Sequence, residues 1–322
     1  MTTASYDAAT LRIAAAAAVR APSLHNSQPW LFRLRDGGIE VLSDPARQLA
    51  IADSTGWAVR IACGAAAYNA QLALAVNGTP AQGELRPYPS EPDVVARLIP
   101  AAPRPATYAE QELFAAIPRR CSNRRPFWPD PVPSEARIRI IDAAHAEGGW
   151  LDLLVGMTAL SGFAQIARSA DRVLRRDPAY RSEMATWTHA DAARDGVPAT
   201  AGAPVTEPQD LLPQRPFTER RRAPGHDFEA EPLIAILGTN GNRPVDQIAA
   251  GQMLQRVLLT VTDAGLACSM ISQPIEVPTA REHLRQSLRR SGTPQMALRI
   301  GYGDPGRPTP RRDLDDLIVG ER

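Results

Sequence analysis

The chain has 322 residues, a net charge of +1 and 44% hydrophobic residues, a composition typical of a globular protein with one large or two ordinary domains. The near-neutral charge gives no electrostatic case for binding nucleic acid. Three cysteines without metal-ligand spacing give no disulfide framework and fit a reducing compartment, so we expect a cytoplasmic protein. No run approaches the roughly 18 apolar residues of a membrane span, and we expect no membrane partner.

The first part of the chain alternates between helical and strand-like patterns. Apolar periodicity and turn residues predict a helix over 7–20, a β-hairpin over 30–42, a helix over 56–78, a strand over 84–89, at most one short helix within 90–105, and a helix over 107–117. The segment 56–78 is apolar on nearly every face, and such a helix belongs inside a core or an interface.

The second part continues the same alternation but contains one long irregular segment. We expect helices over 135–147, over 158–193 with a break around Asp177-Pro178, and over 245–265, and strands near 150–155, 232–239 and 294–303. Residues 195–225 contain six prolines and no periodicity. Long loops of this kind are either functional covers or disordered insertions, and both explanations stay open.

Two apolar helices share a glycine spacing. Gly64 and Gly78 stand 14 residues apart in the first helix, and Gly251 and Gly265 stand equally far apart in the second. Each helix follows a unit made of a helix, a connection and a strand that opens with tryptophan. Either an internal duplication or chance similarity explains this. If the duplication is real, the two apolar helices should pack together at the centre of the fold.

The usual catalytic signatures are absent, and basic residues offer another chemistry. The sequence has no GxSxG, HExxH, P-loop or dinucleotide-binding fingerprint, and its five histidines lack ligand spacing. The stretch RCSNR places Arg120, Ser122 and Arg124 at every second position, on one side of an extended or turning segment. Arginines and a small hydroxyl residue suit the phosphate of a flavin mononucleotide (FMN). The alternative is a basic turn that only links two helices.

Three short stretches together resemble a known family. APSLHNSQPW (21–30) resembles the PSxxNxQPW element of FMN-dependent nitroreductases, RRCSNR (119–124) resembles their phosphate element, and QPIE (273–276) resembles their Pro-Ile-Glu loop. In that family two identical subunits build each FMN site jointly. One chain here carries single copies of both halves, which looks like the Acg branch, a fused pseudo-dimer acting as a monomer.

This resemblance implies a fold class and a division of the chain. We expect an α+β, nitroreductase-like fold with two duplicated halves, whose sheets are flanked by helices around two central apolar helices. Residues 1–110 would form the half with the flavin-ring loop. Residues 111–322 would form the half with the phosphate element, the proline-rich cover segment 195–225 and the C-terminal tail.

The resemblance also implies the residues that bind the cofactor. The flavin ring would lie on the loop formed by Ser23, Leu24, His25, Asn26, Ser27 and Gln28, with Asn26 and Gln28 as the strongest candidates. Arg120 and Arg124 would contact the ribityl and phosphate end or else the O2 edge of the ring, with Ser122 beside the phosphate. The tail would close on the phosphate with Arg311 and Arg312. A backbone N–H near flavin N5 would come from the loop Gln273, Pro274, Ile275 and Glu276. No catalytic side chain and no metal ligand is expected.

The function implied is that of an oxidoreductase. NAD(P)H would be the co-substrate, and a nitroarene or quinone-like small molecule would take two electrons through the flavin, because the cofactor carries the electron chemistry. The alternative function is an FMN-sequestering or storage protein whose segment 195–225 keeps the flavin covered.

Overall fold

The computed structural model describes residues 5–189, 193–202, 210–213, 215, 217 and 232–320. The chain folds into two compact units. Unit 1 comprises Met1–Arg119, Asn242–Leu259 and Arg311–Arg322, and unit 2 comprises Arg120–Gly241 and Thr260–Pro310. The sequence predicts two duplicated halves that are divided after residue 110. The compact units are discontinuous in sequence and do not test this division, so it stays a prediction.

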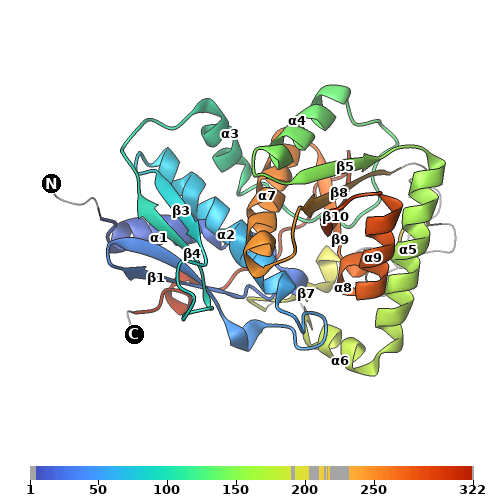
Figure 1. Ribbon diagram of the computed structural model, residues 1–322, viewed down its shortest axis with the longest axis horizontal. Helices are drawn as coiled ribbons and strands as arrows, with labels where there is room; N and C mark the ends of the chain where they lie inside the picture. Colours follow the sequence, from blue (N-terminus) through green and yellow to red (C-terminus); the bar gives the residue numbers. More distant parts are fainter. Residues whose placement is uncertain are drawn as a thin grey trace. The chain divides into compact units, whose positions relative to one another are not determined.

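Unit 1 is built on a four-stranded antiparallel sheet with strand order β1-β2-β4-β3 (Figure 1). Its elements are α1 (Ala8–Ala18), β1 (Trp30–Arg35), β2 (Gly38–Ser43), α2 (Trp57–Val76), β3 (Ala81–Leu85), β4 (Val94–Pro100) and α3 (Tyr108–Ala116), with short 3₁₀ turns at Leu24–Asn26, Pro45–Arg47 and Leu314–Asp316. The side chain of Asp7 caps α1 by accepting the N–H of Thr10, as the sequence predicts.

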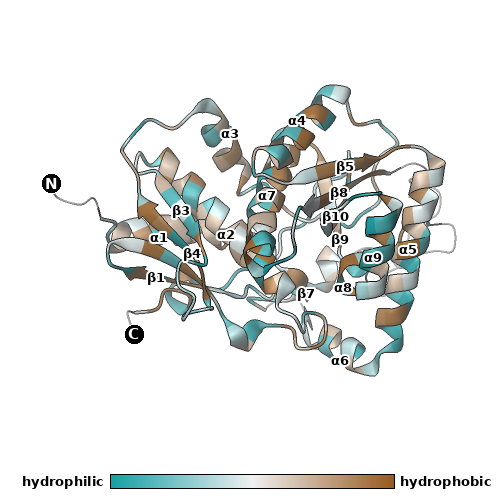
Figure 2. Cartoon of the chain, viewed as in Figure 1, coloured by the Kyte–Doolittle hydropathy of each residue, from teal (hydrophilic) through white to brown (hydrophobic). Residues whose placement is uncertain are grey.

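Unit 2 is built on a second four-stranded antiparallel sheet, with order β5-β8-β10-β9. Its elements are α4 (Ser134–His145), β5 (Trp150–Leu154), α5 (Met157–Arg176), α6 (Pro178–Thr186), β6 (Thr188–His189), β7 (Val197–Pro198), a 3₁₀ turn at Ala199–Ala201, β8 (Leu233–Thr239), β9 (Ala267–Ile271), α8 (Gln273–Glu276), α9 (Pro278–Ser287) and β10 (Thr293–Gly301). Helix α5 bears hydrophobic and hydrophilic residues in turn (Figure 2), and its apolar side is buried. Helix α7 (Pro244–Asp263) begins in unit 1, and its last residues belong to unit 2.

The two sheets repeat one topology, which supports the predicted duplication. In chain order each is formed by a helix, two strands, a helix and two further strands: α1, β1, β2, α2, β3, β4 and α4, β5, β8, α7, β9, β10. In each sheet the fourth of these strands lies between the second and the third. The predicted α+β class with two duplicated halves is therefore confirmed.

The two apolar helices pack against each other through the paired glycines, as the duplication requires. Within unit 1, a Cβ on Gly64 would lie 2.1 Å from the carbonyl oxygen of Ile248, and a Cβ on Gly251 would lie 2.1 Å from that of Ile61. No side chain fits at either point, so the backbones of α2 and α7 touch directly.

Three sequence-based expectations for secondary structure are wrong. The helix expected over 158–193 ends at Thr186, and the short strand β6 follows at Thr188–His189. The segment 90–105, expected to hold at most one short helix, contains β4, which pairs with both β2 and β3. Prolines before and after this strand are turn signals, so the sequence pattern did not predict a strand here. Pro100 is tolerated because it lies at the strand's last position, opposite Ala81. The strand expected over 84–89 is β3, which occupies Ala81–Leu85 instead.

Helix α2 is long and apolar enough to cross a membrane, and among the described helices it alone passes that test. The buried share of its apolar window is 83%, as in the core helix of a globular protein. Its length and composition are therefore weak support for a membrane span.

Candidate functional site

The segment that begins unit 2 lies alongside β9 at the edge of the second sheet. Ser122 forms a parallel bridge with Cys268, and the N–H of Asn123 donates to the Cys268 carbonyl at 2.8 Å. Side chains alternate along an extended chain, so Arg120, Ser122 and Arg124 share one side while buried Asn123 faces the other. This agrees with the one-sided arrangement that the sequence predicts.

Arg124 lies in a buried, positively charged environment. Its guanidinium carbon sits 5.0 Å from the centre of the Phe217 ring, and its Nη1 donates to the Ala201 carbonyl at 3.3 Å. Burial lowers the pKa of Arg124 to about 10, and the neighbouring charges of Arg215 and Arg120 add to the shift. Within the described part of the chain, Arg124 forms no ion pair with a carboxylate, so no described acid compensates its charge.

A buried acid, Glu276, accompanies this arginine group. Arg215 forms an ion pair with Glu276, whose side chain is fully buried, and donates to the Ser272 hydroxyl at 3.1 Å. We call Arg120, Arg124, Arg215 and Glu276 the arginine cluster. Its three arginines are the residue type that gives charge-assisted hydrogen bonds to an anionic phosphate group.

The stretch expected to form a loop beside the flavin is one helical turn, α8, directly after β9. The N–H groups of Ile275 and Glu276 both donate to the Ser272 carbonyl, and that of Val277 donates to Gln273. Pro274 has no N–H, which leaves the N–H of Gln273, at the start of the turn, as the donor that could serve a ligand. Gln273 itself is buried.

The loop of residues 23–28 in unit 1, which we call the polar loop, is largely buried and conformationally strained. His25, Asn26 and Gln28 all adopt positive φ angles, between 50° and 56°, a region that side-chain-bearing residues visit rarely. Each is at most 5% exposed. The loop is held partly from within, since the N–H of Gln28 donates to the Ser23 hydroxyl at 2.9 Å. Such strain persists only where surrounding contacts impose it, and it is frequent at functional sites.

Those contacts come from the C-terminal tail. Arg311 donates from Nη1 to Asn26 Oδ1 at 3.0 Å and from Nε to the Val19 carbonyl at 2.6 Å, beyond the end of α1. The backbone N–H of Arg312 donates to Gln28 Oε1 at 2.9 Å. The structure thus brings Arg311 and Arg312 together with the loop in unit 1. Their predicted contact with a phosphate stays a prediction.

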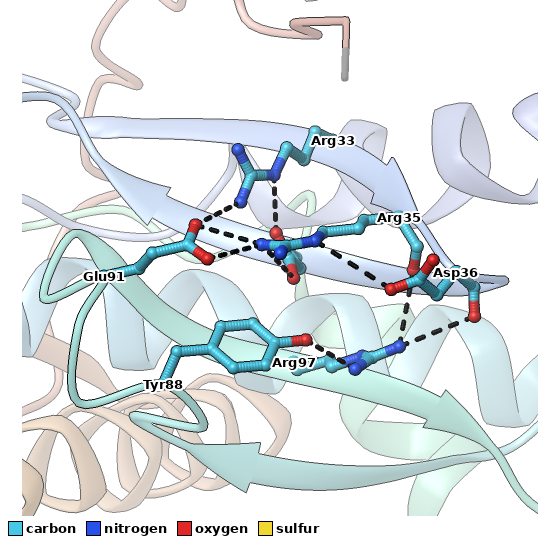
Figure 3. Close-up of polar contacts among 7 residues, drawn as sticks. Arg33, Arg35, Asp36, Tyr88, Glu91 and Arg97 are labelled. Atoms are coloured by element: carbon cyan, nitrogen blue, oxygen red, sulfur yellow. Dashed lines mark hydrogen bonds and ion pairs between the residues drawn. The ribbon is translucent and has the colours of Figure 1, made fainter. Parts of the chain in front are cut away.

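A second polar group of unit 1 has its charges balanced internally (Figure 3). Arg33 pairs with the fully buried Glu40 at 2.5 Å and with Glu91 at 3.0 Å, while Arg35 pairs with Glu91 at 2.8 Å. Some of these residues line part of a hollow of about 740 Å³. Because every arginine here already has a carboxylate or hydroxyl partner, including Arg97 with the Tyr88 hydroxyl, we interpret the group as structural.

Sequence reasoning missed two members of the site, Arg215 and Phe217. Both lie in the predicted cover segment 195–225, whose residues 203–209, 214, 216 and 218–225 fall outside the described residues. Phe217 packs with Val197 and Ala201 of the same segment, and Arg168 on α5 donates to the Asp210 carbonyl at 2.6 Å, so the described parts of the segment contact the rest of unit 2. The only signal in the sequence was an arginine and an aromatic residue among prolines. Among the described residues no group of His, Cys, Asp and Glu could hold a metal ion.

Comparison with known proteins identifies relatives along nearly the whole chain. The chain is 34% identical to "Putative NAD(P)H nitroreductase Rv3131" of Mycobacterium tuberculosis, over 97% of this chain and 92% of the relative. It is 28% identical to "Putative NAD(P)H nitroreductase acg" of the same organism, over 94% and 92%. The FMN and NADPH-dependent nitroreductase NfnB from sphigopyxis sp. strain HMH superposes with a TM-score of 0.44 at 18% identity, over 65% of this chain and 99% of NfnB. No family model matches the chain.

Proposed function

The chain belongs to the NAD(P)H nitroreductase family, in the branch that includes acg, and from this premise we propose that it is an FMN-binding oxidoreductase. It would transfer two electrons from NAD(P)H to a small acceptor such as a nitroarene or a quinone. One chain carries one arginine cluster and one polar loop, so we propose one FMN per chain, in a monomer that acts as an intramolecular pseudo-dimer.

The observation that carries this proposal is that Arg124 is buried and pairs with no carboxylate of the described residues. A cation held among two other arginines, with its pKa lowered by burial, gains stability from a bound dianion. Arg120, Ser122 and Arg124 would hold the FMN phosphate, and Arg215, positioned by Glu276, would complete the group. These residue types give charge-assisted hydrogen bonds to phosphate oxygens.

The polar loop would serve the flavin ring through its shape. Asn26 and Gln28 already bind Arg311 and the Arg312 backbone, so we assign these two arginines to holding the loop in its strained conformation. Ser23, Leu24, His25 and Ser27 would then present their polar backbone and side-chain groups to the ring. A ring of fixed shape binds best to a surface that is already ordered.

FMN, when bound, supplies the hydride-accepting chemistry at N5. The Gln273 N–H would donate a hydrogen bond to the flavin near that atom, and the buried turn α8 would keep it there. Because electron transfer through the flavin needs no side chain as acid or base, we assign no catalytic residue.

A second candidate function is FMN sequestration. Phe217 and Arg215, from the predicted cover segment, pack in the arginine cluster and favour a closed flavin site. A protein whose cover never opens would retain FMN and show little reductase activity.

Two measurements test these proposals. FMN titrated into the apoprotein should saturate at one equivalent, and Arg124→Gln should bind it more weakly than wild type. Anaerobic mixing with NADH or NADPH, followed by the flavin absorbance, should bleach the flavin rapidly. A flavin that dithionite reduces but neither nucleotide reduces would support sequestration. A protein that refuses FMN would overturn both functions.

A further inference from the structure

A second hollow, in unit 2, shares no residue with the proposed flavin site. Its volume is about 400 Å³, and it is lined by the loop 128–132, the end of β5, the start of α5, and residues of β8 and β10. Small-molecule sites usually enclose roughly 300 to 1,000 Å³ and are mostly apolar. The hollow is large enough for a ligand with one or two rings.

Apolar side chains in the wall of this hollow are exposed. Trp128 is 51% exposed and Val155 is 75% exposed. Leu154, which is half-buried, and Leu160 and Ile300, which are buried, continue the apolar lining. Single exposed apolar residues are common, but two that share one concave, mostly apolar lining favour a binding surface.

The wall that carries Trp128 is held in place. The Trp128 N–H donates to the Tyr302 carbonyl at 2.8 Å, and the neighbouring Phe127 ring lies under the guanidinium of Arg299 at 4.1 Å. A Cβ on Gly301 would come within 2.9 Å of that ring, so the glycine makes room for it. Four prolines from position 126 to position 133 restrict the loop further. A ligand would find this surface already formed, which reduces the entropy lost on binding.

One cation, Arg137, lies in this apolar lining. Arg137, half-buried on α4, donates from Nε to the Val132 carbonyl at 2.9 Å, and among the described residues it has no carboxylate partner. Helix α4 offers no acid one turn away, because positions 133, 134, 140 and 141 are Pro, Ser, Ile and Ile. The outer nitrogen atoms of its guanidinium can still donate to a bidentate anion.

Among the described residues of the lining, Asp130 is the one acid. It is exposed and lies beyond ion-pair distance of Arg137, so water screens its repulsion of an anion. We propose that the hollow binds a small aromatic carboxylate, whose ring packs on Trp128 and whose carboxylate pairs with Arg137. This site is independent of the flavin and of the proposed reductase activity.

Isothermal titration of the flavin-loaded protein with 2-naphthoate tests the proposal, with 2-naphthamide as the uncharged probe of equal shape. The acid should bind more tightly than the amide. Arg137→Gln should lower the affinity for the acid about tenfold and leave the amide unchanged. Trp128→Ala should weaken both probes, and Asp130→Asn should strengthen the acid about twofold. Arg139→Gln is the matched control, because Arg139 lies on the same helix but pairs with Asp263 at 2.7 Å.

A probe that binds beside the flavin would change the visible spectrum of the flavin. A ligand in this hollow should leave that spectrum unchanged. Equal affinity for acid and amide would overturn the proposal, as would an Arg137→Gln variant that binds the acid like wild type. Thermal unfolding followed by circular dichroism verifies that each variant is folded.

Discussion

The two halves of the chain repeat one scaffold but differ in the connections between its elements. In the first half, eleven residues, 19–29, join α1 to β1 and include the polar loop, whereas only four residues, 146–149, join α4 to β5 in the second. In the second half, α8 and α9 connect β9 to β10, whereas the first half joins β3 to β4 by an irregular segment. Sheets and apolar helices are repeated, while the chemically distinctive side chains are not.

This difference shows where function can diverge after a duplication. Core positions are constrained by packing on both sides, so the glycines of α2 and α7 stay matched in both helices. Connections at the surface tolerate insertion and exchange of polar residues. Each proposed half of the flavin site therefore occurs once, in a connection whose sequence is not repeated in the other half.

The largest expected effect concerns the paired glycines of α2 and α7, which the two halves share. Gly64→Ala or Gly251→Ala should destabilise the protein by about 3 kcal/mol, because a Cβ would meet a backbone carbonyl 2.1 Å away that cannot turn aside. Chemical denaturation measures the loss. Gly162→Ala is the control: it lies in α5 with open space around it, so better helix propensity should stabilise by up to about 1 kcal/mol. Equal effects at all three glycines would contradict the direct backbone contact.

The next effect concerns the arginine cluster, which the second half alone carries. Arg124→Gln should weaken FMN binding by about one to two decades, since a charged hydrogen bond contributes roughly 1.5 to 3 kcal/mol. Unfolding stability of the apoprotein should not fall, because burial and neighbouring arginines already disfavour this charge. Equilibrium dialysis against FMN measures the affinity. Arg119→Gln, with an exposed side chain next to the same segment, should retain normal binding.

A smaller effect concerns what the first half alone carries. Arg311→Ala removes hydrogen bonds to Asn26 and to the carbonyl of Val19, and should cost about 2 kcal/mol of unfolding free energy. It should also release the strained loop and weaken FMN binding. Arg12→Ala breaks only an exposed ion pair between α1 and Asp315, so it should change stability by less than about 0.5 kcal/mol. If both variants behaved alike, the tail would not be holding the loop.

The smallest effect returns to the shared scaffold. Gly78 and Gly265 follow the equivalent helices with φ angles of 76° and 72°, and neither has an atom within 4 Å of an added Cβ. Gly78→Ala and Gly265→Ala should each cost about 1 kcal/mol, through backbone strain alone. Paired thermal melts compare them. A clear inequality would mean that the two helix ends are no longer equivalent.

The sequence by itself determined the repeated features. Apolar patterns located both central helices, glycine spacing related them, and the extended spacing of Arg120, Ser122 and Arg124 placed three side chains on one side of the chain. These features are local, because periodicity and backbone freedom depend on neighbouring residues.

Only the tertiary structure decided the rest, because it depends on interactions between residues far apart in sequence. Strand β4 is stabilised by pairing on both edges, which outweighs the turn signals of its prolines. The side chain of Gln28 accepts the N–H of Arg312, 284 positions later, so the residue expected to face a ligand also holds its own loop. Arg215 belongs to the arginine cluster because it pairs with Glu276, 61 positions later in the sequence. Burial and charge pairing are properties of the folded chain, and they assigned these side chains their surroundings.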